Sequence, residues 1–266
     1  MLVEFIGSTG AGKTTVLNKV KCCLENSMPT TISSALATDI LGLRGVTHPT
    51  VVNLVQEFVG FPFFVRFLCR YRAYFKCAVS LLFRHSRPGL VMINNFRSIE
   101  RKLGMYCLAR HMERDRVVLI DEGPAQAAHM FAFGRGRLHS EEIDELSKTL
   151  PLPDLLVYVT APMNAVADRT LRRHDPPREM SSHVPAEVVT YAASANGIFD
   201  RLVGSLKHKV PILVIDNPDG DELRNRAVAE SVATVITQHM SHLQSHVSDP
   251  MLVEDRSVAS GRTDAR

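Results

Sequence analysis

The chain has 266 residues, 45% of them hydrophobic and 22% charged, and a formal net charge of +3. This composition is ordinary for a globular protein and argues against disorder and membrane residence, and so small a net charge predicts no nucleic-acid partner. The five cysteines show no C-x-x-C spacing, and the N-terminus lacks the basic segment and cleavage site of a signal peptide. We therefore expect a cytoplasmic protein without nucleic-acid or membrane partners.

Five short apolar runs, rich in β-branched residues, alternate with longer segments of helical periodicity. The runs are Leu2–Ile6, Thr31–Ser34, Val117–Ile120, Leu155–Thr160 and Ile212–Ile215. The second run is weak, but the others are apolar along most of their length, as expected for strands that helices bury on both faces. This pattern predicts an α/β fold in which a five-stranded parallel sheet lies between two helical layers.

Helical segments separate these runs. They are predicted at Lys13–Glu25, Val51–Arg84 with a break near Pro62, Ile99–Met112, Glu141–Leu150, Met163–Arg173, Pro185–Leu206 and Asp221–Ser245. Charged residues interrupt the apolar stretch Leu54–Phe83, so no uncharged run reaches the roughly 20 residues that a spanning helix needs. We expect a core helix there, one domain over residues 1–245 and a disordered polar tail over 246–266.

The first strand runs directly into a phosphate-loop motif, G-x-x-x-x-G-K-[ST]. Its residues, with the threonine that follows, are Gly7, Ser8, Thr9, Gly10, Ala11, Gly12, Lys13, Thr14 and Thr15. Small residues let backbone N–H groups surround phosphate oxygens at a helix N-terminus. Lys13 is expected to reach the β- and γ-phosphates, and Thr14 to place its hydroxyl on Mg²⁺. The alternative is a glycine-rich turn that matches by chance, which the placement after an apolar strand disfavours.

The third strand ends in two carboxylates, Asp121 and Glu122, followed by Gly123. This is the form of a Walker B segment, in which Asp121 would hold Mg²⁺ opposite Thr14. Glu122 has two candidate roles: it could accept a proton from an acceptor hydroxyl, or orient a water for hydrolysis. The structural alternative is that both acids cap a helix that begins near Pro124.

A basic segment follows the fourth strand. It carries Arg169, Arg172, Arg173 and Arg178 around a turn-rich stretch. Phosphoryl transfer spreads negative charge over the moving group, and a mobile basic segment can neutralise it. We predict a lid over about 169–183, with Arg169, Arg173 and Arg178 as its catalytic candidates. The alternative is a solvated helix face.

Taken in order, these motifs resemble the P-loop nucleoside and nucleotide kinases, most closely thymidylate-kinase-like proteins. The resemblance is carried by Gly7–Thr14, by the strand Pro153–Val159 with the Arg169 helix after it, and by the late strand Val210–Asn217. Thymidylate kinases carry Asp-Arg-Tyr where this chain has Asp-Glu-Gly at 121–123, so the arginine and aromatic of their acceptor site are missing.

The resemblance implies strand order 2-3-1-4-5, an ATP site at the C-terminal strand ends and a helical lid. It also implies that Asn217 and Pro218 lie beside adenine. An arginine that holds an acceptor phosphate would be Arg97 or Arg101, with a slight preference for Arg101, unless both are simply exposed helix residues.

The sequence therefore predicts an ATP-dependent phosphotransferase that uses Mg²⁺-ATP and a small-molecule acceptor, a nucleoside or nucleotide. One alternative is a P-loop ATPase or GTPase that acts as a conformational switch, with Glu122 orienting the attacking water. Another is a nucleotide-binding regulator without turnover. The lack of an N-K-x-D sequence favours ATP over GTP. The oligomeric state is left open, with a homodimer as one candidate.

Overall fold

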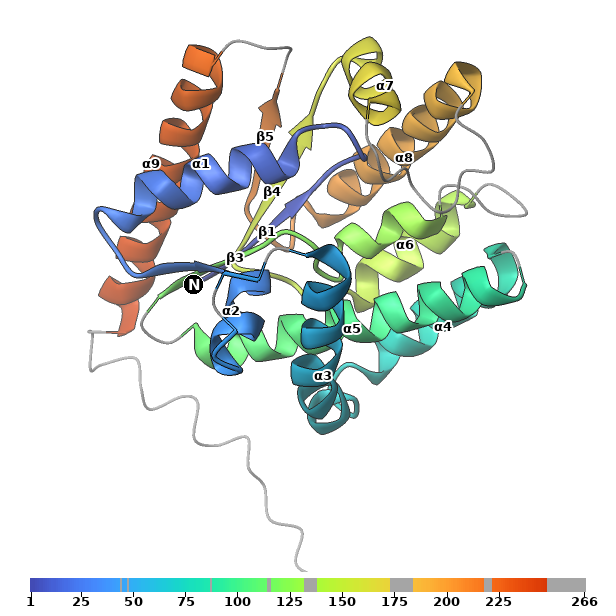
Figure 1. The fold of residues 1–266 in the computed structure, drawn as a ribbon, viewed down its shortest axis with the longest axis horizontal. Helices are drawn as coiled ribbons and strands as arrows, with labels where there is room; N and C mark the ends of the chain where they lie inside the picture. Colours follow the sequence, from blue (N-terminus) through green and yellow to red (C-terminus); the bar gives the residue numbers. More distant parts are fainter. Residues whose placement is uncertain are drawn as a thin grey trace, which may run out of the picture.

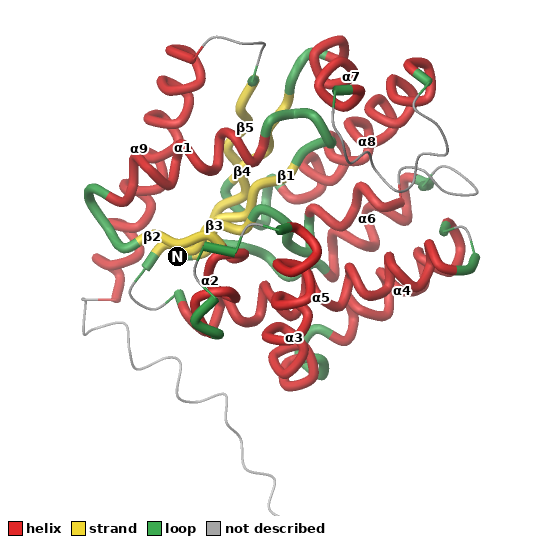
Figure 2. The backbone as a smooth tube through the Cα atoms, in the orientation of Figure 1, coloured by secondary structure: helices red, strands yellow, loops and turns green. Residues whose placement is uncertain are grey.

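A central sheet of five parallel strands organises the molecule (Figure 1, Figure 2). The computed structural model describes residues 1–43, 45–46, 48–86, 88–113, 116–131, 138–172, 184–217 and 222–247. The strands are β1 (Leu2–Ile6), β2 (Thr30–Ile32), β3 (Val117–Ile120), β4 (Leu155–Thr160) and β5 (Ile212–Asp216). Their order is β2-β3-β1-β4-β5, which confirms the predicted three-layer fold and strand order.

The central strand β1 is buried on both faces, and its side chains alternate between two cores. Val3 and Phe5 pack in the core formed with α1 (Lys13–Glu25) and α9 (Glu222–Val247). Leu2 and Ile6 pack in the core on the opposite face. Burial on both sides explains why the strand is apolar along almost its whole length.

Most of the helical part of the second core comes from α4 (Arg72–His85), α5 (Leu90–Met112), α6 (Ser140–Thr149) and α8 (Pro185–Leu206). In Figure 1 they lie on the side of the sheet opposite α1 and α9. The remaining helices are α2 (Ser33–Ile40), α3 (Pro49–Phe67), α7 (Met163–Leu171) and the short 3-10 helix η1 (Gln126–Phe131). α2 and α3 pack with α5 in a third, smaller cluster.

Strand register fixes where the functional loops meet. Glu4 of β1 pairs with Ile120 of β3, so Asp121 and Glu122 leave the sheet beside the strand that leads into the phosphate loop. Because carboxyl ends of parallel strands gather at one edge, this register brings the two motifs together, although more than 100 residues separate them.

The largest differences from the sequence-based prediction lie in the second strand and in the long helical stretches before the third strand. The second strand ends at Ile32, not Ser34, because Ser33 already begins α2, a helix that the sequence did not predict. α5 begins at Leu90, not Ile99. The predicted break near Pro62 is wrong: α3 continues through this proline to Phe67. Pro62 is exposed, so water can satisfy the carbonyl whose helical donor the proline removes.

The long helical stretch actually breaks after Phe67, where the chain bends by 119° between α3 and α4. Within the described ranges, no single helix has the length and apolar character needed to cross a membrane. The bent pair of α3 and α4 does meet these two criteria when taken together.

Candidate functional site

The phosphate loop is packed closely against its surroundings. Gly7, Gly10 and Gly12 have φ angles of +146°, +88° and +89°, which L side chains rarely adopt. A Cβ on Gly12 would lie 2.1 Å from Nδ2 of Asn217, and one on Gly7 would lie 2.3 Å from the carbonyl oxygen of Val159. Both the conformation and the lack of space therefore require glycine.

Lys13 is the first residue of α1, and its side chain folds back over the loop. Its Nζ donates hydrogen bonds to the carbonyl oxygens of Gly7 (2.8 Å) and Ser8 (3.0 Å). Thr14 and Thr15 follow in the first turn and are exposed. A lysine ammonium beside free N–H groups at a helix N-terminus is the arrangement expected for binding phosphate. The loop therefore fits the triphosphate of a nucleotide.

Gln126, at the start of η1, holds the loop at its first residue. Its Oε1 accepts the N–H of Gly7 (3.0 Å), and its Nε2 donates to the carbonyl oxygen of Gly7 (3.1 Å). The backbone N–H of Gln126 donates to Oε1 of Glu4 (3.0 Å). The segment after β3 is thereby joined to the phosphate loop.

Two side chains of α7 hold the middle of the loop. Thr170 Oγ1 lies 3.2 Å from the carbonyl oxygen of Thr9 and 2.7 Å from that of Val166, so these two acceptors share its one hydroxyl proton. Arg169 donates from Nη1 to the carbonyl oxygen of Gly10 (3.3 Å). Arg169 thus lies at the phosphate loop, and its role in a lid stays a prediction. Arg172 instead pairs with Asp168 at 2.7 Å, where both side chains are more than half exposed.

The other lid candidates, Arg173 and Arg178, lie outside the described residues, as does most of the predicted lid at 169–183. The described part of that segment ends just after α7, which stops at Leu171, before the predicted end at Arg173. Their catalytic roles stay predictions.

Asn217, directly after β5, completes the support of the loop. Its Nδ2 donates to the carbonyl oxygen of Ala11 (2.8 Å), and its side chain is buried. Its own carbonyl oxygen accepts from Arg169 at 3.4 and 3.5 Å. The structure therefore places Asn217 against the phosphate loop. Contact with adenine stays a prediction, and Pro218 lies outside the described residues.

Asp121 follows β3 and accepts a hydrogen bond on Oδ1 from Oγ of Ser33 (3.0 Å). Burial raises the pKa of Asp121, the neighbouring charge of Glu122 adds to this, and the Ser33 bond opposes it. Mg²⁺ is commonly held by one or two carboxylates together with substrate phosphates and water. Asp121 beside the phosphate loop fits that requirement with Thr14, and across the described ranges no cluster of three His, Cys, Asp or Glu side chains offers another metal site.

Glu122 is bound by two cations of α5. Its Oε2 lies 2.7 Å from Nζ of Lys102 and 3.6 Å from Nη2 of Arg101. The charge of Lys102 is the largest cause that lowers the pKa of Glu122, to about 2. The Lys102 side chain is 2% exposed whereas that of Glu122 is 59% exposed, so solvent screens part of this attraction. Glu122 is thus a carboxylate at neutral pH and a weak proton acceptor.

The two candidate acceptor arginines point to different partners. Arg101 lies at Glu122 with its side chain 14% exposed. Arg97 forms an ion pair with Glu57 on α3, and its side chain is 53% exposed. Only Arg101 is therefore placed beside the acidic pair, although its role toward an acceptor stays a prediction.

Glu4 lies beneath the site and is fully buried in β1. Burial raises its pKa to about 7, while N–H groups of Gln126 and Ala125 and the charge of Lys102 oppose the rise. A Cβ on Gly123 would lie 2.5 Å from this carboxyl group, so Gly123 lets the chain after Glu122 pass over Glu4. Glu4 therefore carries a proton over part of the neutral range.

Sequence reasoning did not identify five residues of this site. They are Glu4, Ser33, Lys102, Gln126 and Thr170. Glu4 did leave a signal, because a single carboxylate inside the run Leu2–Ile6 is costly to bury without a purpose. Lys102 left a weaker one, since it falls among the buried residues of α5. The others belong to no recognisable motif.

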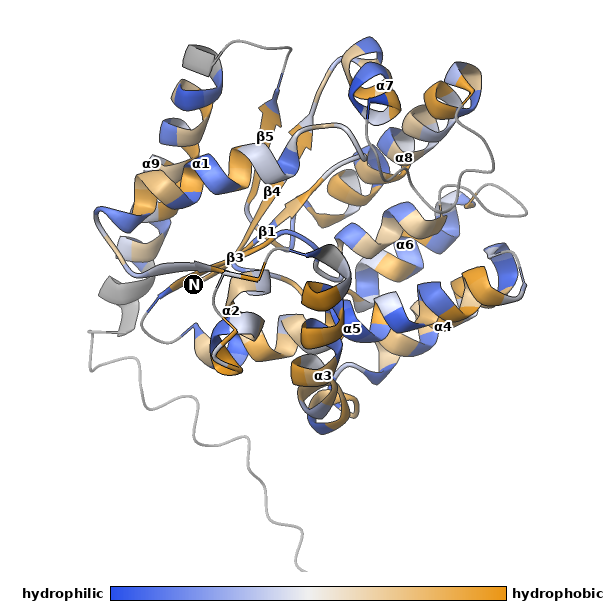
Figure 3. Ribbon diagram, viewed as in Figure 1, coloured by the Kyte–Doolittle hydropathy of each residue, from blue (hydrophilic) through white to orange (hydrophobic). Residues whose placement is uncertain are grey.

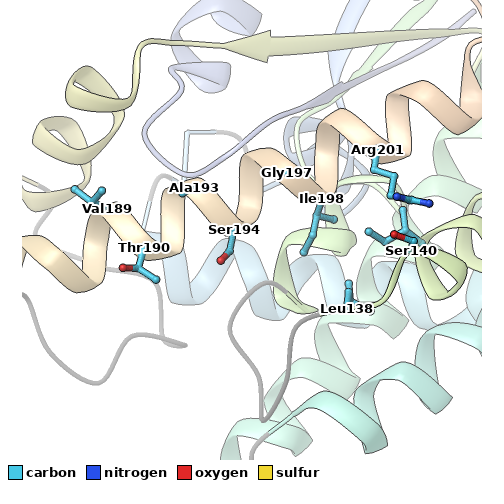
Figure 4. Close-up of a pocket in the computed structure, with 10 residues that line it drawn as sticks. Leu138, Ser140, Val189, Thr190, Ala193, Ser194, Gly197, Ile198 and Arg201 are labelled. Atoms are coloured by element: carbon cyan, nitrogen blue, oxygen red, sulfur yellow. The ribbon is translucent and has the colours of Figure 1, made fainter.

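A separate groove of about 620 Å³ lies along α8 and α6 (Figure 4). Ser194, Ile198 and Arg201 of α8 line it with Ser140 and Leu138. None of its lining residues belongs to the phosphate loop or the acidic pair, and its arginine already faces Asp144 at 3.5 Å. We therefore place the candidate site at the phosphate loop and not in this groove.

Comparison with known proteins gives similarity only at the level of architecture. One similar structure is deoxyadenosine kinase from M. mycoides with bound dATP, at 12% identity and a TM-score of 0.46, covering 88% of this chain and 100% of that one. Another is shikimate kinase from Acinetobacter baumannii with shikimate, at 14% identity and a TM-score of 0.39, covering 91% and 94%. No protein-family model matches the chain, and no curated protein matches it. Similarity this low carries no functional argument.

Proposed function

We propose that this chain is a phosphotransferase that uses Mg²⁺-ATP to phosphorylate a small molecule, a nucleoside or nucleotide in the first instance. The observation that carries the proposal is the geometry of the phosphate loop. Lys13 is held over the loop by the carbonyl oxygens of Gly7 and Ser8, at the N-terminus of α1. This arrangement supports binding of a triphosphate.

Each residue of the site has a proposed task. The loop and Lys13 hold the phosphates, while Thr14 and Asp121 hold the metal. Bound Mg²⁺ supplies charge neutralisation and orients the phosphate oxygens. Arg169 touches the loop at Gly10, so it can act on negative charge that develops there.

Transfer to an acceptor is favoured over hydrolysis by the surroundings of Glu122. A carboxylate whose pKa is held at about 2 by Lys102 accepts protons poorly from water or a hydroxyl. Its stronger effect is to fix Arg101 and Lys102 at the carboxyl end of β3, where Arg101 can bind an anionic acceptor. We propose that the acceptor carries a phosphate or carboxylate near its reacting hydroxyl.

The alternative is an ATPase or GTPase switch in which Glu122 orients a water molecule. It is supported by the 59% exposure of the Glu122 side chain, which leaves the carboxylate open to solvent. This alternative predicts turnover without an acceptor that collapses in Glu122→Gln, while nucleotide binding survives.

Transfer of labelled γ-phosphate from ATP to a panel of nucleosides, nucleotides and anionic hydroxyl metabolites tests the proposal. We expect label on at least one acceptor class, loss of transfer in Lys13→Ala, and normal transfer in Lys21→Ala, which changes a lysine on the same helix that pairs with Glu25. Steady hydrolysis with no labelled acceptor would establish the switch instead. Tight ATP binding without any turnover would leave only a regulatory role.

A further inference from the structure

One side of α3 exposes an apolar stripe, which we call the α3 face. Its members and exposed fractions are Val51 (41%), Leu54 (62%), Phe58 (71%), Phe61 (52%) and Val65 (55%). The spacing alternates between three and four residues, which places all five on one side of the helix. Figure 3 shows α3 coloured as hydrophobic along most of its visible length.

α3 carries further apolar residues outside this stripe, and the fold covers them. Val55 and Val59 pack in the small cluster with α2 and α5, and Phe64 packs in the core with α4 and α5. A helix that is hydrophobic all round is normally buried all round. We expected a core helix here, but the fold buries only part of the apolar surface of α3. The α3 face stays exposed and is free to contact another molecule.

The chain segment that follows Glu57 is strongly basic. After Glu57 the next acidic residue is Glu100, so residues 58–99 contain none. An even spread of the chain's 28 acidic residues would place about four in such a segment. The same segment holds seven basic residues: Arg66, Arg70, Arg72, Lys76, Arg84, Arg87 and Arg97.

Several of these cations cluster where α3 meets α4. Arg66, Arg70, Arg72 and Lys76 are exposed, and no acidic side chain in the described part of the chain forms an ion pair with any of the four. The guanidinium of Arg66 lies 5.5 Å from the ring centre of Phe67. This basic corner borders the C-terminal end of the α3 face, because Arg66 directly follows Val65.

The same chemistry continues onto α5. Leu90 and Ile93 are 78% and 52% exposed and lie in the acid-free segment. Ile93 follows Leu90 by three residues and Arg97 follows it by seven, so all three residues lie on one face of α5. Arg97 contacts Glu57, next to Phe58. A second exposed apolar pair therefore lies on the face of α5 that Arg97 joins to α3.

We propose that the α3 face and its basic corner bind an anionic lipid surface, with α3 lying in the plane of the headgroups. Exposed phenylalanine and leucine side chains beside arginine and lysine are typical of helices that rest on membranes without crossing them. The 119° bend between α3 and α4 suits such a surface contact. This proposal departs from the sequence-based expectation of no membrane partner, which rested on composition and on the lack of an uncharged run long enough to span a bilayer.

A second copy of the chain fits this surface less well. A twofold interface applies the same patch to itself, so it would bring two sets of basic residues to one interface without adding any acidic partner for them. Like charges brought together oppose association, whereas anionic headgroups attract them. Each basic residue near an anionic membrane contributes roughly fivefold to binding, and salt screens the effect.

Vesicle co-sedimentation of the full chain tests the inference without any nucleotide, so its result is independent of the proposed kinase activity. We expect binding to vesicles of phosphatidylcholine with about 30% phosphatidylserine, weak binding to pure phosphatidylcholine, and loss of binding as salt rises toward about 1 M. The double variant Phe58→Ser/Phe61→Ser and the double variant Arg70→Glu/Lys76→Glu should each reduce binding at least tenfold. The matched controls Val214→Ser and Arg226→Ser, which change exposed residues on β5 and α9, should bind as the parent does.

A solvent-sensitive dye gives a second readout that needs no mutation of the face. Cys69 is exposed at the basic corner, and Cys22 is exposed on α1. A dye on Cys69, in a variant with Cys22 and Cys23 changed to serine, should shift to the blue with anionic vesicles. The same dye on Cys22, in a Cys69→Ser/Cys23→Ser variant, should not.

Two results would overturn the inference. One is equal vesicle binding by parent and both double variants, which would move the contact elsewhere. The other is no vesicle binding by a folded parent, including the case in which light scattering shows a dimer that Phe58→Ser/Phe61→Ser dissociates, since the α3 face would then join two copies.

Discussion

Gln126 and Gly7 exchange a pair of hydrogen bonds across 119 positions of sequence: the side-chain amide of Gln126 satisfies both the N–H and the carbonyl oxygen of Gly7, at 3.0 and 3.1 Å. Gln126 is itself held from β1, where Glu4 accepts its backbone N–H. The entry to the phosphate loop is therefore held by the segment that carries the acidic pair. We expect a substitution in either of these two segments to alter the geometry of the other.

Replacing Gln126 by alanine should loosen the phosphate loop. The buried N–H of Gly7 would lose its acceptor, which costs about 1–3 kcal/mol of unfolding free energy. We also expect weaker ATP binding, because the loop amides would be less well positioned. Urea denaturation and calorimetric titration measure the two effects. Gln238→Ala, an exposed position on α9, should change stability by no more than about 0.5 kcal/mol, and equal behaviour of the two variants would contradict the role of Gln126.

Gly12→Ala and Gly42→Ala form a matched pair that separates backbone strain from close packing. Both residues have positive φ, +89° and +67°, so each alanine costs about 1–2 kcal/mol in strain. Only the Gly12 variant meets a neighbour, Nδ2 of Asn217, and overpacking adds about 1–3 kcal/mol. We expect Gly12→Ala to lower the melting temperature more and to abolish ATP binding, and Gly42→Ala to bind ATP normally. Similar losses in both variants would show that strain alone matters.

The pair of Lys102 and Glu122 should show a pH-dependent coupling. Because the pKa of Glu122 is lowered to about 2, its contribution to stability is complete above about pH 4.5 and is lost as pH falls toward 2. A double-mutant cycle with Lys102→Met and Glu122→Gln should give about 1–2 kcal/mol at pH 7, a range reduced for the solvent exposure of Glu122. Urea denaturation should give a clearly smaller coupling at pH 3. A coupling that does not change with pH would rule out this ion pair as its source.

Glu4 should change the free energy of unfolding with pH in the opposite direction to Glu122. Its pKa is raised to about 7, so the folded protein holds a proton that the unfolded chain releases near pH 4.5. The free energy of unfolding therefore falls as pH rises from about 4.5 to 7. Above that range the buried carboxyl group is ionised and causes no further loss. Relative to Glu4→Gln, the parent should lose about 2–3 kcal/mol between pH 5 and pH 8.

The control for this measurement is Glu145→Gln, at an exposed position on α6. Its stability should follow that of the parent across the same pH range. Parallel curves for the parent and Glu4→Gln would show that the buried carboxyl does not titrate in this window.

The sequence predicted the sheet and the phosphate loop because both depend on local patterns. Apolar runs define the strands, and the loop motif lies within eight consecutive residues. The bounds of α1 and α8 match the prediction fully, since each helix begins at a recognisable signal. α2 was missed because it is only eight residues long, too short to show a helical repeat, and because its first residues were assigned to the second strand.

The supports of the site could not be predicted in the same way, because each joins distant parts of the chain. Nothing near Gln126 indicates that its partner is Gly7. Arg97 and Arg101 are four residues apart and share one helix face, so spacing cannot separate them. What separates them is Glu57 on α3, which pairs with Arg97, and Glu122, which lies beside Arg101. The packing of α3 on α5 therefore decides which of the two arginines lies beside Glu122.

The support of Ala11 by Asn217 has a consequence for synthesis on the ribosome. Asn217 emerges 206 positions after the residue whose carbonyl oxygen it binds. A nascent chain that ends before β5 already contains the phosphate loop, but it lacks the side-chain amide of Asn217 that donates to Ala11. The phosphate loop can thus gain this hydrogen bond only in a chain whose translation has passed Asn217, and prematurely terminated products are left without this source of stabilisation.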